Sequence, residues 1–167
     1  AYAGEGVTQW QHAWQCGRLA RQAGAAAPLQ AAAWLHDIGH LLDGDTGTPT
    51  LQGVDDRHEV RAAALLEPLF GAAVAGPVAL HVQAKRYLVG THAGYAARLS
   101  ADSRRSLALQ GGPMTADEAA SWLAQPHAPD ALRLRVWDDL AKDGAAHPDD
   151  DAQARAGLAA LLAACAL

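Results

Sequence analysis

The pair His36-Asp37, inside the segment Leu35-His36-Asp37-Ile38-Gly39-His40, is the clearest sign of chemistry in this chain. An adjacent imidazole and carboxylate in an otherwise apolar stretch are costly to bury unless something binds them. A metal ion is the usual partner, because a neutral imidazole offers one directed nitrogen lone pair and a carboxylate can hold one ion or bridge two. The dipeptide alone is not specific, so the prediction of a metal site depends on further ligands elsewhere in the chain.

Further residues of ligand type lie in segments that we expect to be helical, namely His12, His58, His81 and Asp138. Any one of them alone would more often be an ordinary surface or core residue. Taken together, they exceed the needs of one four-coordinate ion and suit a pair of metals that share Asp37. The other candidates look structural: we place in turns His92, His127 and His147, and we expect solvated carboxylates at Asp139, Asp149, Asp150 and Asp151.

The elements that must position these residues follow from composition. The chain has 167 residues, which we expect to form a single domain over 1–167, and half of them are hydrophobic, with Ala and Leu in excess. One Phe and three Tyr argue against a β-rich architecture. We therefore predict an all-α bundle of seven or eight helices around a binuclear metal site.

Capping boxes and prolines set the expected helix boundaries. Thr8 with Gln11 opens a helix to about Ala23, and Thr115 with Glu118 opens another. The remaining expected helices run from Pro28 to about Leu42, from Asp56 with Glu59 to near Pro68, from Gly76-Pro77 onward, from after Ser100 to Gly111-Gly112-Pro113, from about Pro129 to Lys142 and from about Pro148 to Ala164, with a loop from Gly44 to Gly53.

Three pairs at helical spacing each join a candidate ligand to another polar side chain. They are His36 with His40, His81 with Lys85, and Asp138 with Arg135. Residues three or four apart share one face of a helix. The second member of each pair could therefore meet a molecule bound to the metals, an arrangement that packing alone does not explain.

Charge and composition exclude several other classes of protein. A net charge of −5 without a basic run argues against nucleic acid as the main partner. No apolar stretch reaches the ~20 residues of a membrane span, and no signal peptide is visible. The two cysteines do not make a disulfide framework. We expect a cytoplasmic protein, whereas the sequence predicts nothing about its oligomeric state.

The order His…His-Asp…Asp resembles the HD-domain superfamily of metal-dependent phosphohydrolases, and the two additional histidines resemble its binuclear members. Within it, the chain is similar to the mixed-valence diiron oxygenases that cleave the C–P bond of 1-hydroxyphosphonates, which include glycine-forming and betaine-forming enzymes. The resemblance covers residues 2 to about 143 and rests on Tyr2-Ala3-Gly4-Glu5, His12, the segment around His36, Asp56-Arg57-His58-Glu59, His81-Val82-Gln83-Ala84-Lys85-Arg86-Tyr87, Leu99-Ser100-Ala101-Asp102-Ser103, Leu109-Gln110-Gly111-Gly112-Pro113-Met114 and Arg135-Val136-Trp137-Asp138-Asp139-Leu140-Ala141-Lys142.

The resemblance implies two irons, as an Fe(II)/Fe(III) pair, with O₂ as co-substrate. One iron would be held by His12, His36, Asp37 and Asp138, and the other by His58 and His81, with Asp37 bridging. Tyr2 would occupy an open iron position until substrate displaces it, and Glu5 would meet the substrate's amino end. The phosphonate pocket would be lined by His40, Lys85, Ser103 and Arg135.

The implied substrate is a small 1-hydroxy-2-aminoethylphosphonate-type molecule, which would give phosphate and either glycine or an N-methylated glycine such as betaine. Lys85 and Arg135 suit a dianionic phosphonate, which needs cationic donors at fixed places. Trp10 and Trp14 could offer aromatic faces to a methylated ammonium. We expect both to be core residues, and therefore place the primary amine slightly ahead.

Two other classes of function share the same ligands. The first is an HD-type phosphohydrolase acting on a phosphate ester or nucleotide with Mn, Mg or Zn. The second is a degenerate domain that binds or regulates without catalysis, against which the complete ligand set argues. Tyr2 and Glu5 favour the oxygenase, because a hydrolase has no need for a displaceable phenolate.

Overall fold

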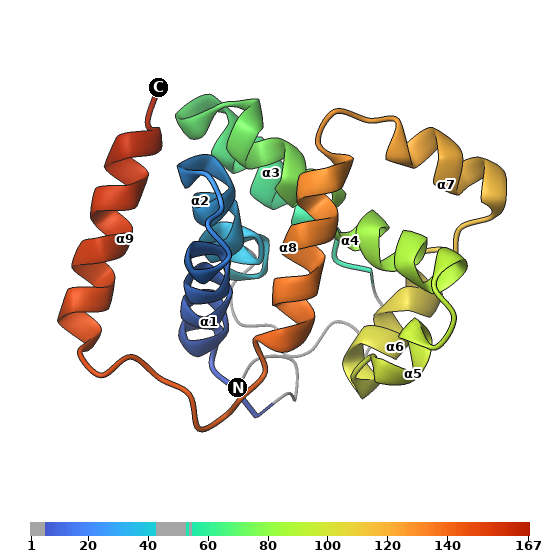
Figure 1. Ribbon diagram of the computed structural model, residues 1–167, viewed down its shortest axis with the longest axis horizontal. Coiled ribbons are helices and arrows are strands. Elements are labelled where there is room, and N and C mark those ends of the chain that lie inside the picture. The colour runs from blue at the N-terminus through green and yellow to red at the C-terminus, as the bar shows by residue number, and fades with distance from the viewer. Residues whose placement is uncertain (1–5, 43–52, 54) are drawn as a thin grey trace.

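The computed structural model describes residues 6–42, 53 and 55–167 (Figure 1). Over these residues the chain forms nine α-helices, one short 3₁₀ helix and no strand. The elements are α1 (Gln9–Gln22), α2 (Ala27–Leu35), η1 (Ile38–Leu41), α3 (His58–Phe70), α4 (Ala72–Thr91), α5 (Tyr95–Arg98), α6 (Ala101–Leu109), α7 (Ala116–Leu123), α8 (Ala128–Leu140) and α9 (Asp151–Cys165). The prediction of an all-α bundle is confirmed, with a helix count close to the one expected.

Helix α4 is the central element of the bundle, because it contacts α2, α3, α7 and α8. Helix α1 packs on α2 and α8, while η1 packs on α3. In Figure 1, α9 lies along the outer side of α1 and α2, and α5 to α7 gather at the other end of the bundle. The helices that carry the candidate ligands are therefore the ones that pack against each other.

Small side chains bring these helices close together. Ala31, Ala32 and Ala33 on α2 are fully buried in the main core. A Cβ on Gly17 of α1 would lie 2.1 Å from the indole nitrogen of Trp34 on α2, far inside van der Waals contact. The excess of Ala in the composition thus serves close helix packing, which lets short imidazole side chains from different helices meet.

The helix predicted from Pro28 to about Leu42 is wrong in its second half. Helix α2 ends at Leu35, and Asp37 adopts φ −98° and ψ 7° before η1 begins. Gly39 then contacts α3 so closely that a Cβ there would lie 2.1 Å from the His58 carbonyl oxygen. This packing of η1 on α3 replaces a continuous helix, so His36 and His40 do not share one helix face.

The helix start predicted at Gly76-Pro77 is also wrong. Helix α4 begins at Ala72, so Pro77 lies inside it and His81 lies well beyond its first turn. The buried face of Val74, Ala75 and Val78 overrides the local proline signal. Helix α3 begins at His58, two residues after the expected start at Asp56, so His58 lies in the first turn as predicted, and the Asp56 carboxylate accepts the His58 N–H.

The remaining boundaries agree well with the sequence. Both capping boxes form, at Thr8 with Gln11 and at Thr115 with Glu118. Ser100 caps α6, as the prediction of a helix after this residue requires. Helices α8 and α9 lie within three residues of their predicted ends. The four-residue α5 was not predicted, and most of the predicted loop from Gly44 to Gly53 lies outside the described residues.

Trp10 and Trp14 lie on the side of α1 opposite to His12, because residues two apart on a helix point about 200° away from each other. The Trp10 ring packs 5.5 Å from that of Trp34, and its Nε1 donates to Asp151 at the start of α9. The guanidinium of Arg18 lies over Trp14. Both indoles are only half-buried and point away from the side of α1 that carries His12. None of the described helices combines the length and apolarity that crossing a bilayer requires.

Candidate metal centre

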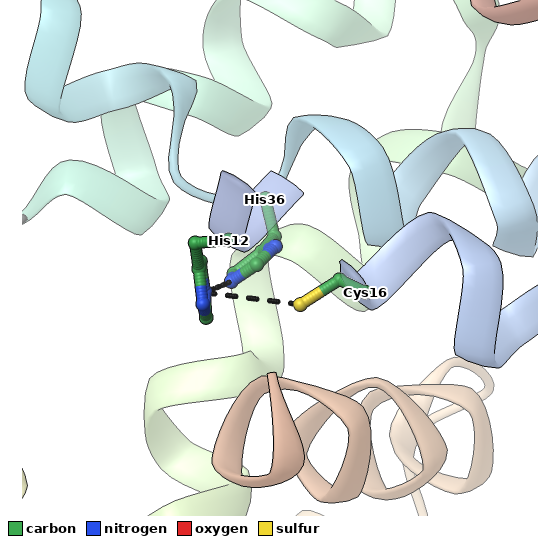
Figure 2. Close-up of side chains that lie close together, drawn as sticks. All are labelled: His12, Cys16 and His36. Atoms are coloured by element: carbon green, nitrogen blue, oxygen red, sulfur yellow. Dashed lines mark hydrogen bonds between the residues drawn. The ribbon is translucent and has the colours of Figure 1, made fainter. Parts of the chain in front are cut away.

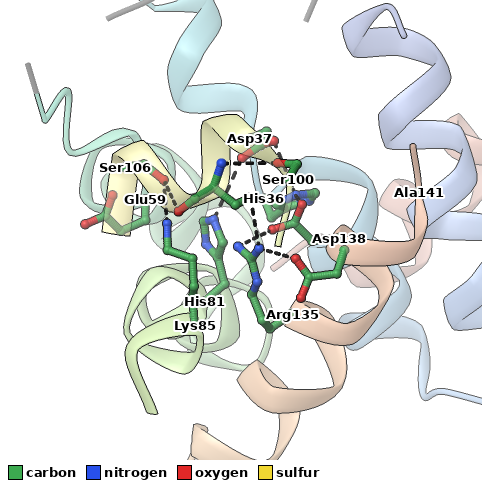
Figure 3. A network of polar contacts seen from close by, with 12 residues as sticks. His36, Asp37, Glu59, His81, Lys85, Ser100, Ser106, Arg135, Asp138 and Ala141 are labelled. Atoms are coloured by element: carbon green, nitrogen blue, oxygen red, sulfur yellow. Dashed lines mark hydrogen bonds and ion pairs between the residues drawn. The ribbon is translucent and has the colours of Figure 1, made fainter. Parts of the chain in front are cut away.

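Four histidines, from three helices and from the segment that follows α2, point their Nε2 atoms into one buried space. His12 lies on α1, His36 just after α2, His58 at the start of α3 and His81 on α4. The Nε2 atoms of His12 and His36 are 3.3 Å apart, as are those of His58 and His81. Figure 2 shows His12 beside His36, and Figure 3 shows His36 and His81 in the same region. The structure therefore brings together all four histidines that the sequence singled out.

In each of these histidines, the hydrogen-bond partner of Nδ1 determines whether Nε2 carries a hydrogen or a lone pair. Each Nδ1 faces an oxygen that can only accept a hydrogen bond: Ala141 O at 2.8 Å from His12, Ala33 O at 3.0 Å from His36, Val78 O at 2.7 Å from His81 and Asp56 Oδ1 at 3.0 Å from His58. Each Nδ1 must therefore carry a hydrogen. In the neutral ring the Nε2 atom then presents a lone pair. Four lone pairs aimed at each other repel unless cations lie between them.

The two oxygens of Asp37 face different histidine pairs. Its Oδ2 lies 3.4 Å from His36 Nε2 and 3.5 Å from His12 Nε2. Its Oδ1 lies 3.4 Å from His58 Nε2 and 3.8 Å from His81 Nε2. This is the arrangement that a carboxylate bridging two ions requires.

Asp138 on α8 completes the first group. Its Oδ1 lies 3.4 Å from His12 Nε2 and 4.0 Å from His36 Nε2, while its Oδ2 accepts a hydrogen bond of 2.8 Å from Arg135 Nη1. One oxygen therefore faces the candidate ligands and the other is held by a buried cation. The donor set of imidazole and carboxylate fits a divalent or trivalent transition metal in each group.

Burial and neighbouring charges shift the pKa values of His36, His81 and Asp37 in the metal-free protein. Burial alone would lower the pKa of His36, but the carboxylates of Asp37 and Asp138 outweigh it and raise the pKa to about 9. Burial and the nearby His36 and His58 lower the pKa of His81 well below its ordinary value. Burial would raise the pKa of Asp37, yet His36 holds it well below the usual range. Bound protons can thus balance the carboxylates, and metal binding must displace them.

Cys16 is a neighbour of the first group that the sequence did not indicate. It lies one turn after His12 and is fully buried, with its Sγ 3.7 Å from His12 Nε2 (Figure 2). Its sulfur and the ring nitrogens of His12 and His36 lie within 4.8 Å of one another. Burial raises the pKa of the Cys16 thiol, which favours a neutral side chain beside the candidate ligands.

His40 lies beside the second group, as one of the expected pocket residues. Its ring stacks on His58 at 4.0 Å, and its Nδ1 lies 2.7 Å from Asp56 Oδ2. Because Asp56 Oδ1 contacts His58 Nδ1, this carboxylate holds both rings. Burial would lower the pKa of His40, but Asp56 and Asp37 raise it. Asp56 was predicted only as a helix start. A carboxylate two residues before a candidate ligand is a signal that could have indicated this contact.

The other three described pocket candidates lie together on the α4, α6 and α8 side of the centre. Lys85 is almost fully buried and donates a 2.6 Å hydrogen bond to Ser106 Oγ (Figure 3). Arg135 Nη2 lies 3.4 Å from Ser103 Oγ. Lys142 Nζ approaches the same hydroxyl at 3.4 Å. Three cationic side chains therefore approach one serine-rich helix next to the candidate ligands.

The prediction that Asp139 is a solvated charge is wrong. Its side chain is only 22 % exposed, and its carboxylate accepts hydrogen bonds from Arg135 Nη2 and from the Tyr95 hydroxyl. The spacing of Arg135 and Asp139, four residues apart on a helix, could have indicated the ion pair. No spacing in the sequence indicates the contact of Tyr95 with Asp139. The two expected catalytic residues, Tyr2 and Glu5, lie outside the described residues.

The fold and the two ligand groups define a class of protein. Residues 10–143 match the family described as "HD domain", so the chain belongs to the HD-domain family. Within that family, it is 45% identical over 139 residues to "Hydroxymethylphosphonate dioxygenase" of Gimesia maris, a match that covers 83% of this chain and 69% of the relative.

A second relative is 39% identical over 142 residues, with 84% of this chain and 72% of the relative covered. It is "[1-hydroxy-2-(trimethylamino)ethyl]phosphonate dioxygenase (glycine-betaine-forming)" of Leisingera caerulea. "Uncharacterized protein L432" of Acanthamoeba polyphaga mimivirus is 34% identical over 143 residues, covering 84% of this chain and 65% of that protein. The chain therefore belongs to the group of HD-domain proteins that contains these phosphonate dioxygenases, as the sequence motifs predicted.

Proposed function

We propose that this protein is a diiron oxygenase that uses O₂ to cleave the C–P bond of a 1-hydroxyphosphonate. The observation that carries the proposal is Asp37, whose two oxygens face two separate histidine pairs near the buried cations Lys85 and Arg135. The names of the two dioxygenase relatives support the same activity. In the balanced reaction, a 1-hydroxyphosphonate dianion and O₂ give a carboxylate, hydrogen phosphate and one proton.

The proposed metal ligands are His12, His36, Asp37 and Asp138 for one iron, and His58 and His81 with Asp37 for the other. An iron pair supplies the redox chemistry and the open coordination position that O₂ and the substrate hydroxyl need. The Nδ1 contacts described above hold each imidazole in the tautomer that can bind metal. Burial of the four histidines and of Asp138 would keep competing water away from the reacting carbon.

The phosphonate would bind to Arg135, Lys85 and Ser103. Arg135 and Lys85 can each give it charge-assisted hydrogen bonds of roughly 1.5–3 kcal/mol. Burial and the nearby Arg135 lower the pKa of Lys85 to about 7, so the Nζ atom can hold or release a proton near neutral pH. His40, held by Asp56, would approach the substrate from the side of the second iron.

These residues indicate the type of reaction more specifically than they indicate the substrate. The 45% identical relative is named for hydroxymethylphosphonate, which has no nitrogen, and this favours hydroxymethylphosphonate as a candidate. An amine-bearing substrate remains a prediction, because it depends on Glu5. That a displaceable side chain occupies the open iron position also remains a prediction, because it depends on Tyr2. The outward packing of Trp10 and Trp14 gives a trimethylammonium group no support from these two indoles. We also propose a reducing cytoplasmic setting, which the two free thiols Cys16 and Cys165 support.

Phosphate release under air and under argon tests the proposal. Iron-loaded protein is offered hydroxymethylphosphonate, 1-hydroxy-2-aminoethylphosphonate and its trimethylammonium analogue, with p-nitrophenyl phosphate as the hydrolase substrate. We expect release from at least one hydroxyphosphonate only with O₂, and ¹⁸O from ¹⁸O₂ in the products. Release from the ester under argon, with none from any hydroxyphosphonate in air, would establish the phosphohydrolase instead.

The iron pair is tested separately. We expect about two irons per chain and, after partial reduction, the electron paramagnetic resonance signal of a mixed-valence pair. Tyr2→Phe tests the prediction that the Tyr2 phenolate occupies an open iron position. The wild type should show a visible absorption band that fades when substrate is added, and this band should be missing from the variant. Protein that is active with one bound metal would contradict the diiron proposal.

A further inference from the structure

Arg135 is held by more partners than the phosphonate proposal uses. This side chain is 4 % exposed, and each of its three nitrogens donates a hydrogen bond. Nη1 donates to Asp138 and Nη2 to Ser103 and Asp139, while Nε donates to the Tyr95 hydroxyl at 3.3 Å. The Tyr95 hydroxyl in turn donates to Asp139, so the three side chains form a closed ring of contacts.

The two carboxylates next to Arg135 have different surroundings. Asp138 turns its Oδ1 toward His12 and His36 and only its Oδ2 toward the guanidinium. Asp139 contacts Arg135 and Tyr95 and none of the candidate metal ligands among the contacts described above. If a metal draws negative charge from Asp138, Asp139 still provides a full counter-charge for the buried guanidinium.

Tyr95 links this ring to a different part of the fold. It is the first residue of α5 and is 7 % exposed, packed in a small cluster with Leu88 and Leu99. Burial raises the pKa of the Tyr95 hydroxyl, so it keeps its hydrogen and donates to Asp139. A fixed hydroxyl on α5 therefore determines where Nε, and with it the plane of the guanidinium, can lie.

We propose that Tyr95 and Asp139 are positioning residues, which orient the Arg135 guanidinium so that it can bind the phosphonate group. The inference rests on the proposed function. A planar guanidinium binds two oxygens well only when its plane is correctly aligned, and neither Tyr95 nor Asp139 needs to touch the substrate for this effect.

The test measures binding of inorganic phosphate, the product that all the proposed substrates share, to iron-loaded protein under argon. Tyr95→Phe keeps the packed ring and removes the hydroxyl, and Asp139→Asn keeps the shape and removes the charge. We expect each to raise the dissociation constant for phosphate about 10-fold, with unchanged iron content. Tyr87→Phe, which removes a hydroxyl from the half-buried ring beside Trp122, is the matched control and should bind like the wild type.

A double-mutant cycle separates positioning from a general structural effect. Arg135→Lys removes the planar fork, so adding Tyr95→Phe to it should weaken phosphate binding by less than 2-fold further. Equal losses from Tyr95→Phe in both backgrounds would overturn the inference, as would wild-type affinity in both single variants. If a variant unfolds, as circular dichroism would show, the other single variant completes the cycle with Arg135→Lys.

The outcome of the cycle is independent of turnover. A wild-type protein that binds phosphate but converts no hydroxyphosphonate in air would contradict the proposed function and leave the coupling of Tyr95 to Arg135 measurable. With turnover present, we expect the variants to raise KM at least 5-fold more than they lower kcat. A fall in kcat with unchanged KM would contradict positioning for binding.

Discussion

Asp37 contributes one oxygen to each half of the candidate centre, so its removal should affect both halves. Asp37→Ala leaves four facing imidazoles with no shared anion, and we expect it to lose both irons. His81→Ala should empty mainly the second position, because its Nε2 faces only the Oδ1 side of Asp37. Iron determination on purified protein checks both. Asp130→Ala, at an exposed pair with Arg133, is the control. Two irons retained in Asp37→Ala would disprove the bridging assignment.

Lys85 should make phosphate binding depend on pH. With its pKa lowered to about 7, Lys85 is charged below this pH and neutral above it in the free protein. An anion prefers the charged form, so binding above pH 7 must include uptake of a proton, and the dissociation constant should rise up to about 10-fold per pH unit.

Calorimetric titration between pH 6 and 9 measures this dependence. Lys85→Arg should lose the Lys85 part of it, because a guanidinium stays charged throughout this range. The ionisation of phosphate itself is common to both proteins and cancels in the comparison. Identical pH profiles in the two proteins would contradict a titrating Lys85.

At the residue scale, the sequence indicated which candidate metal ligands lie close together, but it did not indicate all of the side chains that hold these ligands and Arg135 in place. The His-Asp pair, the other histidines and Asp138 were found by chemical type, because few other roles explain so many buried ligands. Asp56 and Asp139 were missed although their spacing from His58 and Arg135 permits these contacts, since solvated carboxylates often occur at the same spacing. Tyr95 could not be found, because its contact with Arg135 depends on the path of the chain between α4 and α6.

At the scale of elements, the contact of η1 with α3 sets the distance between Asp37 and His58. A Cβ on Gly39 would lie 2.1 Å from the His58 carbonyl oxygen and 2.8 Å from its carbon. Gly39→Ala must therefore push η1 away from α3, and we expect it to destabilise the fold by about 1–3 kcal/mol and to lower the iron content.

Gly157→Ala on α9 is the matched control. Nothing lies within 4 Å of a Cβ built there, and alanine is the better helix former by about 0.5–1 kcal/mol. Thermal unfolding and iron analysis of both variants measure the effect. Unchanged stability and iron content in Gly39→Ala would show that η1 does not set the distance.

The helices were predictable to the extent that their ends carry local signals. Capping boxes gave the starts of α1 and α7 because the hydrogen bonds that define them join residues three apart. The break between α2 and η1 carries no such signal, since it results from packing on α3. Pro77 gave a wrong helix start because a proline usually lies in the first turn of a helix. Here the buried apolar face of α4 keeps the helix continuous across Pro77.

At the scale of the whole molecule, the metals should hold the bundle together. The proposed ligands come from α1, α3, α4 and α8 and from the segment between α2 and η1, so a metal bound by them would link these elements directly. Anaerobic removal of iron with a chelator should therefore lower the melting temperature. Free metal at about 1,000 times its dissociation constant stabilises a fold by roughly 4 kcal/mol.

Scanning calorimetry of the iron-loaded, stripped and reloaded protein measures this difference. Restoration by Fe(II), and not by Mg²⁺, would agree with the imidazole-rich ligand set. A melting temperature that stays the same after complete loss of iron would show that the metals add nothing to the fold.

Asp138 faces the candidate ligands through one oxygen and Arg135 through the other, so on the proposed function a metal and a phosphonate bound to Arg135 would act on one carboxylate from opposite sides. Thermodynamic reciprocity then applies: if the metal changes the affinity for phosphonate by some factor, the phosphonate changes the affinity for metal by the same factor. On the proposed function, iron retention would then depend on whether phosphonate is bound. Enzyme that is supplied with phosphonate and enzyme that is starved of it would hold their iron with different dissociation constants.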